Sequence, residues 1–108
     1  MNNAEARARL QEKARTLSQR IDAISRDLQQ AHSASFAEQA SERENDDVLH
    51  GLLAESRRSL QQVNDTLARI DEGSYGLCIR CGNGIDEQRL AALPEAETCI
   101  HCMAVAGY

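Results

Sequence analysis

The stretch that decides the fold begins Cys78-Ile79-Arg80-Cys81-Gly82 and ends Cys99-Ile100-His101-Cys102. It holds all four cysteines of the chain, as two Cys-x-x-Cys pairs with 17 residues between Cys81 and Cys99. A two-residue gap lets one tight turn direct both sulfurs at one ion, and two such turns complete a tetrahedral site. Gly82 suits such a turn because glycine tolerates positive φ. The sequence therefore predicts one structural zinc ion bound by Cys78, Cys81, Cys99 and Cys102.

Other uses of four cysteines fit the sequence less well. Two disulfides would suit an exported domain, but the N-terminus lacks the apolar core of a signal peptide. A four-thiolate iron site has similar spacing, but this segment offers few bulky residues to shield a redox centre. A redox-active Cys-x-x-Cys pair would need a thioredoxin-like βαβ context, which is absent from the pattern. His101 is expected at the solvated surface, since four thiolates already fill the site.

The composition favours a helical rod over a large globular core. The chain has 108 residues, no tryptophan, and only Phe36, Tyr75 and Tyr108 as aromatic residues. A chain with so few bulky residues is better stabilised by long paired helices and a structural metal site. The net charge of −5 argues against duplex DNA as the main partner. No apolar run approaches membrane-spanning length, so we expect a cytoplasmic protein whose thiols stay reduced.

Residues 4–31 predict one long helix, which neither glycine nor proline interrupts. Its apolar residues recur at alternating spacings of four and three, the a/d seam of a coiled coil. The seam consists of Leu10, Ala14, Leu17, Ile21, Ile24, Leu28 and Ala31. A single helix with this stripe needs a partner helix to bury it.

A second seam with the same spacing runs up to Glu72, and Gly73 is the expected C-terminal glycine of that helix. Its members are Leu49, Leu53, Ser56, Leu60, Val63, Leu67 and Ile70, with Ser56 as the one polar member. Two seams joined by a polar turn predict an antiparallel hairpin. A fully helical stretch from residue 36 to 72 would be about 55 Å long. A homodimeric coiled coil is the competing arrangement, but it would not explain why residues 32–47 interrupt the pattern between the two seams.

Residues 32–47 form the expected tip of this hairpin. From Ser35 to Asp47 the chain has five acidic residues and one arginine. Ser35 is a candidate N-cap for the second helix, with Glu38 as its capping-box partner. Considered alone, this segment is a capped turn whose solvated acids suit the helix dipole.

The base of the hairpin contains no catalytic motif. Residues 85–93 predict a short helix that stops before Pro94, and residues 103–108 are too few for a long closing helix. The chain lacks a glycine-rich phosphate loop, a Ser/His/Asp grouping and a histidine-rich metal motif. We therefore expect a non-enzymatic, mainly α protein, with a coiled-coil hairpin over residues 1–72 and a four-cysteine zinc finger over residues 73–108.

From residue 70 to 102 the chain resembles the DksA/TraR family of bacterial transcription regulators. The matching residues are Ile70-Asp71-Glu72-Gly73-Ser74-Tyr75-Gly76-Leu77-Cys78-Ile79-Arg80-Cys81-Gly82, then Gly84-Ile85, Arg89-Leu90, Leu93-Pro94 and Cys99-Ile100-His101-Cys102. The resemblance implies a regulator that binds RNA polymerase rather than promoter DNA. It also implies that the hairpin enters the secondary channel of the polymerase, towards the catalytic centre. We expect no membrane partner and a monomer, because the hairpin supplies its own partner helix.

The resemblance also implies residues for the tip and for a nucleotide. The family's tip pattern is Asp-x-x-Asp-x-Ala, and counting back from Cys78 places Ser35-Phe36-Ala37-Glu38-Gln39-Ala40 there. Glu38 and Ala40 are thus the expected polymerase-contacting residues, while Ser35 replaces the first aspartate. Family members hold guanosine tetraphosphate with basic residues near the base and carry a C-terminal helix. This chain has Gln61 and Gln62 at the matching lysine positions and is too short for that helix, which argues against dependence on the nucleotide.

Two other interpretations remain open from the sequence. A zinc-ribbon module would bind nucleic acid through Arg80 and Arg89, although the base lacks a basic surface interleaved with aromatic residues. A structural adaptor would instead use the rod to pair with a helix of another protein.

Overall fold

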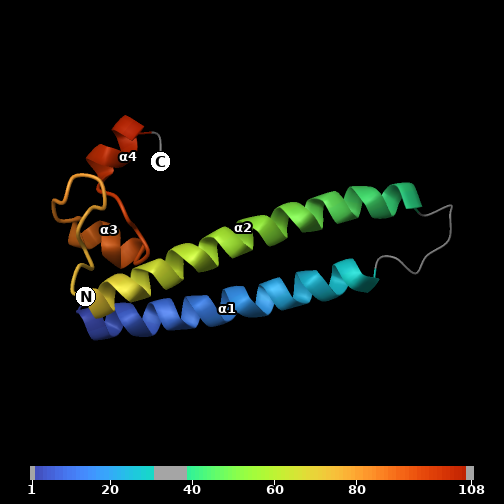
Figure 1. Ribbon diagram of the computed structural model, residues 1–108, viewed down its shortest axis with the longest axis horizontal. Coiled ribbons are helices and arrows are strands. Elements are labelled where there is room, and N and C mark those ends of the chain that lie inside the picture. The colour runs from blue at the N-terminus through green and yellow to red at the C-terminus, as the bar shows by residue number, and fades with distance from the viewer. Residues whose placement is uncertain (1, 31–38, 107–108) are drawn as a thin grey trace.

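The computed structural model describes residues 2–30 and 39–106, and Figure 1 shows their arrangement. This part of the chain contains four helices, α1 (Asn3–Gln30), α2 (Gln39–Glu72), α3 (Glu87–Ala92) and α4 (Ile100–Ala106). The two long helices α1 and α2 lie side by side and run in opposite directions, while α3 and α4 gather at one end. The described residues extend over 56 × 30 × 20 Å. The predicted antiparallel hairpin on a small base is therefore confirmed.

Helix α1 begins with a side-chain cap. The Oδ1 atom of Asn2 accepts a hydrogen bond from the backbone N–H of Glu5 at 2.8 Å, which satisfies one of the unpaired donors of the first turn. The Glu5 carboxylate also lies in that turn, where the helix dipole favours negative charge. The helix begins one residue before the predicted range of 4–31, and the last residue of that range lies outside the described residues.

Helix α2 has 34 residues, which corresponds to a length of about 51 Å. It ends at Glu72 and is followed by Gly73, whose φ is 81°. The N–H of Gly73 donates to the Ile70 carbonyl at 3.2 Å, and the N–H of Ser74 donates to the Arg69 carbonyl at 2.9 Å. This pair of hydrogen bonds is a Schellman motif, and it confirms the predicted role of Gly73. The predicted N-cap of this helix, Ser35 with Glu38, lies outside the described residues.

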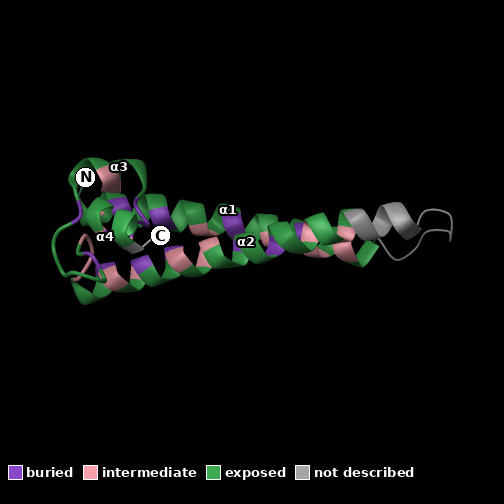
Figure 2. Ribbon diagram, turned by 90° about the horizontal axis from the view of Figure 1, so that it is seen from above, coloured by how far each residue is buried: buried purple, intermediate pink, exposed green. Residues whose placement is uncertain are grey.

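The two predicted seams face each other and form the interior of the hairpin, as the buried residues in Figure 2 indicate. Leu10 of α1 and Val63 of α2 are fully buried. They belong to one cluster near the base, which comprises Ala6, Leu10, Leu17, Val63 and Ile70. Burial of a leucine or valine side chain stabilises a fold by about 1.5–3 kcal/mol, so this cluster anchors the hairpin at its base.

Beyond this cluster, the described part of the hairpin buries fewer apolar side chains. Ile24 and Leu53 are buried there, and so is Ser56, the polar member of the second seam. Val48 and Leu52 lie on the same stretch of α2 but are 61% and 45% exposed. Among the described residues, the hydrophobic cluster of the hairpin therefore lies near the cysteines.

Candidate metal centre and hairpin tip

The four cysteines meet at the base of the hairpin. Their sulfur atoms all lie within 4.8 Å of one another, and the Sγ atoms of Cys81 and Cys99 are 3.8 Å apart. A tetrahedral zinc ion with bonds of about 2.3 Å would separate its sulfurs by about 3.8 Å. None of the four cysteines forms a disulfide bond. The donor set and its spacing fit one structural zinc ion.

A tight turn presents the first cysteine pair. The backbone N–H of Cys78 donates to the Asn83 carbonyl at 2.8 Å, and the N–H of Gly82 donates to the Cys78 carbonyl at 2.9 Å. Gly82 adopts a φ of 78°, as the sequence predicts for a glycine after the second cysteine. An isolated antiparallel bridge between Leu77 and Gly84 closes the turn. Both sulfurs of the pair are thus held by backbone geometry.

The start of α4 presents the second pair. Cys99 directly precedes this helix, and its sulfur accepts a hydrogen bond from the N–H of Cys102 at 3.4 Å. The N–H of Met103 donates to the Cys99 carbonyl at 3.0 Å and continues the turn into the helix. The seven-residue α4 is not among the predicted elements, because a segment this short carries too little periodicity to be recognised. His101 is exposed on α4, as predicted.

Hydrogen bonds at the centre perturb two of the thiols in opposite directions. The backbone N–H of Cys81 lowers the pKa of Cys78 to about 6, because it stabilises the thiolate. The side chain of Cys99, together with burial, raises the pKa of Cys102 to about 12. The first turn is therefore set up to hold a thiolate. A divalent cation among the sulfurs favours the thiolate at every position.

The expected tip residues lie largely beyond what the structure describes. Glu38 is outside the described residues. Ala40 belongs to the first turn of α2, at the end of the hairpin that is remote from the cysteines, and its side chain is not described.

A groove of about 540 Å³ lies where the second long helix meets the base. Gln61 and Gln62 line it, together with three arginines, Arg58, Arg80 and Arg89. The Gln61 amide donates to Asp65 at 2.8 Å, and the Gln62 amide donates to the Glu95 carbonyl at 2.9 Å. The Arg89 guanidinium is bonded to the Thr98 carbonyl at 3.0 Å. Several of the polar groups around this groove thus already have partners within the chain.

Comparison with known proteins places both parts of the chain in one family. Residues 73–105 match the profile of the prokaryotic dksA/traR C4-type zinc finger. Residues 7–70 match the profile of the DnaK suppressor protein-like N-terminal domain. The second match alone covers more than half of the chain.

Individual relatives agree with these profiles. The RNA polymerase-binding transcription factor DksA of Haemophilus influenzae is 36% identical over 50 residues, which are 46% of this chain and 34% of that protein. DksA of Escherichia coli K12 is 34% identical over 50 residues, which are 46% of this chain and 33% of that protein. The matches therefore span about a third of the length of these curated relatives. The structure of transcription factor DksA2 from Pseudomonas aeruginosa superposes with a TM-score of 0.89 and 25% identity, covering 97% of this chain and 82% of DksA2.

Two further observations accompany the family match. Among the described residues, no helix combines the length and apolar character needed to cross a membrane. The curated relatives are named as transcription factors rather than enzymes, in line with the expectation from the sequence. From its two profile matches, its fold and its four-cysteine centre, the chain belongs to the DksA/TraR family of C4 zinc-finger proteins.

Proposed function

We propose that this chain is a transcription regulator that binds RNA polymerase directly. In this proposal it inserts the tip of its hairpin through the secondary channel and modulates initiation. The observation that carries the proposal is the close superposition on DksA2 over nearly the whole chain. The curated relatives in Haemophilus influenzae and Escherichia coli are named for binding RNA polymerase. A rod of about 51 Å on a compact base has the shape needed to reach into a channel.

The base supports this function by holding the rod in one place. We propose that Cys78, Cys81, Cys99 and Cys102 bind one zinc ion, which fills the site and leaves no position for a substrate. The end of α2 at Glu72 supports a division into a hairpin over residues 1–72 and a zinc finger over residues 73–108. In this proposal the zinc ion is structural, and the contacts that regulate transcription are made by the hairpin of α1 and α2.

We propose Glu38 and Ala40 as the residues that contact the polymerase. Ala40 lies in the first turn of α2, at the end remote from the cysteines, and Glu38 directly precedes that helix in the sequence. A small side chain at position 40 permits close approach, and a carboxylate at position 38 supplies the charge of the family's tip pattern. Ser35, in place of the first aspartate of that pattern, changes the charge of the tip and with it the strength of the effect.

We also propose that the effect does not depend on guanosine tetraphosphate. The amides of Gln61 and Gln62 are already hydrogen bonded to Asp65 and to the Glu95 carbonyl. Asp65 and Glu97 add two carboxylates to the lining of the same groove. A polyphosphate would meet these carboxylates at close range, which is electrostatically unfavourable. The groove is therefore a poor site for this nucleotide despite its arginines.

The remaining properties follow from charge and packing. A net charge of −5 does not favour binding to duplex DNA, which requires a basic surface. We therefore propose that the chain binds the polymerase and not the promoter DNA. The seams bury each other within one chain, which supports a monomer. We propose a cytoplasmic location, because the proposed partner belongs to the transcription machinery.

Multi-round transcription with purified bacterial RNA polymerase tests the proposal. A stable-RNA promoter and an amino-acid-biosynthesis promoter would be compared, with and without guanosine tetraphosphate. We expect a promoter-selective effect that the Glu38→Ala, Ala40→Thr double variant abolishes and that the nucleotide leaves unchanged.

The matched control is the Glu87→Ala, Ala68→Thr double variant. It makes the same two chemical changes at exposed positions on the base and on the lower part of α2. It should keep the full effect. Equal loss of activity in both double variants would contradict a site at the tip, and no effect of the unsubstituted protein at either promoter would contradict the proposed function itself.

A further inference from the structure

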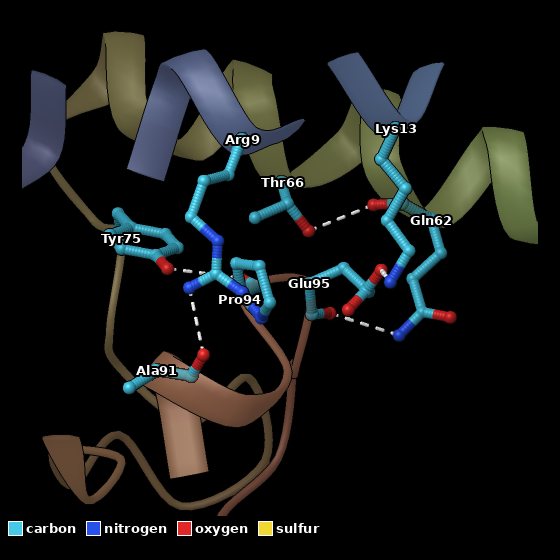
Figure 3. Close-up of polar contacts among 8 residues, drawn as sticks. All are labelled: Arg9, Lys13, Gln62, Thr66, Tyr75, Ala91, Pro94 and Glu95. Carbon is cyan, nitrogen blue, oxygen red and sulfur yellow. Dashed lines mark hydrogen bonds and ion pairs between the residues drawn. The ribbon is translucent and has the colours of Figure 1, made fainter. Parts of the chain in front are cut away.

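One segment of the base contacts both long helices and ends at the metal centre. We call it the strap; it spans residues 91–98, which are the end of α3 and the loop that follows. Figure 3 shows Arg9 and Lys13 reaching the strap from α1, while Gln62 reaches it from α2. The next residue after the strap is Cys99, the first sulfur of the second cysteine pair. The strap therefore links the hairpin to the cysteines through a short and continuous piece of backbone.

A buried carboxylate lies at the middle of the strap. The side chain of Glu95 is only 7% exposed, and its Oε2 atom forms an ion pair with the ammonium of Lys13. Its Oε1 atom is buried and has no hydrogen-bond partner among the described residues. Burial of a carboxylate is unfavourable unless it is paired and hydrogen bonded. Lys13 thus holds the strap against α1 through Glu95, but only one of the two carboxylate oxygens of Glu95 is paired.

Several backbone carbonyls of the strap are also held from outside it, including that of Thr98, which accepts from Arg89 at 3.0 Å. The Arg9 guanidinium donates to the Ala91 carbonyl at 2.7 Å, and the Tyr75 hydroxyl donates to the Pro94 carbonyl at 3.0 Å. The Gln62 amide donates to the Glu95 carbonyl at 2.9 Å. The backbone N–H of Ile79, within the first cysteine turn, donates to the Glu97 carbonyl at 2.9 Å. The strap consequently contacts α1, α2 and the metal turn at the same time.

We propose that the strap couples metal binding at the four cysteines to the anchoring of α1 at the base of the hairpin. A zinc ion would fix Cys99 and the turn of the first cysteine pair, which contains Ile79. Cys99 directly follows the strap and Ile79 is hydrogen bonded to it, so both hold the strap backbone in the position where Glu95 meets Lys13. Without the ion, the end of the strap next to Cys99 is no longer fixed. Burial of the Glu95 carboxylate, which lacks a hydrogen bond at Oε1, then becomes less favourable. By thermodynamic linkage, a change at Lys13 must in turn alter the affinity for zinc.

The position of the strap gives this coupling a mechanical consequence. It contacts the hairpin at one end of a rod of about 51 Å, and a rotation of about 5° there displaces the far end by about 4 Å. The orientation of the tip therefore depends on how the strap is seated. Lys13 and Glu95 act as positioning residues in this account, although neither lies near the tip.

Zinc affinity of the 108-residue chain tests the coupling without reference to transcription. Lys13→Met removes the ammonium and keeps most of the side-chain volume, and its zinc dissociation constant would be measured by competition with a chromophoric chelator. Couplings between sites commonly change affinity by roughly 5- to 150-fold, and we expect about tenfold weaker binding. The Lys13→Met, Glu95→Gln double variant should recover much of this loss, because it no longer buries an unpaired charge.

Arg15→Met is the matched control. Arg15 forms an ion pair with Glu12 on the exposed surface of the same helix, two residues from Lys13. This variant should change zinc affinity by less than about twofold, as for other exposed ion pairs. A Lys13→Met protein with unchanged zinc affinity, or one no different from Arg15→Met, would overturn the coupling.

Hydrogen exchange on the unsubstituted protein gives a second test that needs no variant. Removal of zinc should speed amide exchange in the part of α1 that carries Arg9 and Lys13, more than in the part of α1 near Ile24. An equal increase along the whole of α1, or none near Lys13, would show that the strap does not transmit the state of the metal centre.

Discussion

Replacement of Leu10 by alanine should remove a large share of the stability of the hairpin. Leu10 is fully buried in the cluster with Leu17, Val63 and Ile70. Three carbon atoms are lost, which corresponds to about 2.4 kcal/mol of transfer free energy. The cavity that remains adds about 1 kcal/mol, because the neighbouring helices relax only partly. The sum of about 3–4 kcal/mol compares with a total of about 5–15 kcal/mol expected for a chain of this size.

Urea titration of the zinc-saturated protein, followed by circular dichroism at 222 nm, measures this loss. Leu52→Ala is the matched control, since it makes the same chemical change at a side chain that is 45% exposed. We expect it to cost less than about 1 kcal/mol. Equal costs for the two variants would refute the assignment of the hydrophobic interior to the cluster at the base.

Three further outcomes follow from the base and the second helix. Gly73→Ala places a side chain at a φ of 81° and should lower the free energy of unfolding by about 1–2 kcal/mol, whereas Gly51→Ala, in open space within α2, should raise it by about 0.5–1 kcal/mol in the same urea titration. Elemental analysis should find one zinc per chain, which Cys99→Ser releases and His101→Ala retains. Burial raises the pKa of Tyr75 above its ordinary value of about 10. The stability that the neutral hydroxyl contributes is therefore complete below about pH 10 and is lost as the pH rises through the pKa of the folded state. Thermal melts between about pH 9 and 12 should show this alkaline loss for the unsubstituted protein and not for Tyr75→Phe.

The sequence predicts the hairpin well because the periodicity of the seams is long and regular. Leu10, Leu17 and Ile24 alternate in burial with their neighbours, as a coiled-coil seam requires. Gly73 is predictable for a separate reason, since a glycine after a long helical pattern commonly adopts the left-handed conformation. The cysteine spacing likewise predicts a four-sulfur site, because few other geometries use two Cys-x-x-Cys pairs.

The packing of the base is not predictable from these patterns. Ala6 is fully buried, and only its spacing of four residues before Leu10 could have extended the seam to include it. Thr66 is fully buried outside the seam, where its hydroxyl donates to the Gln62 carbonyl at 2.8 Å. Glu95 is buried although glutamate is usually exposed, and its partner Lys13 is distant in sequence. Such contacts depend on tertiary structure, so local composition carries no signal for them.

Photo-crosslinking from the tip would report directly on whether the hairpin enters the secondary channel of the polymerase. A benzophenone amino acid at position 40 would be compared with one at position 68, on the same helix near the base. We expect position 40 alone to crosslink to polymerase segments beside the catalytic centre, and we expect another factor bound in the secondary channel to block the crosslink. A polymerase-bound protein that gives no such crosslink from position 40, or one that the competing factor leaves unchanged, would contradict entry through that channel.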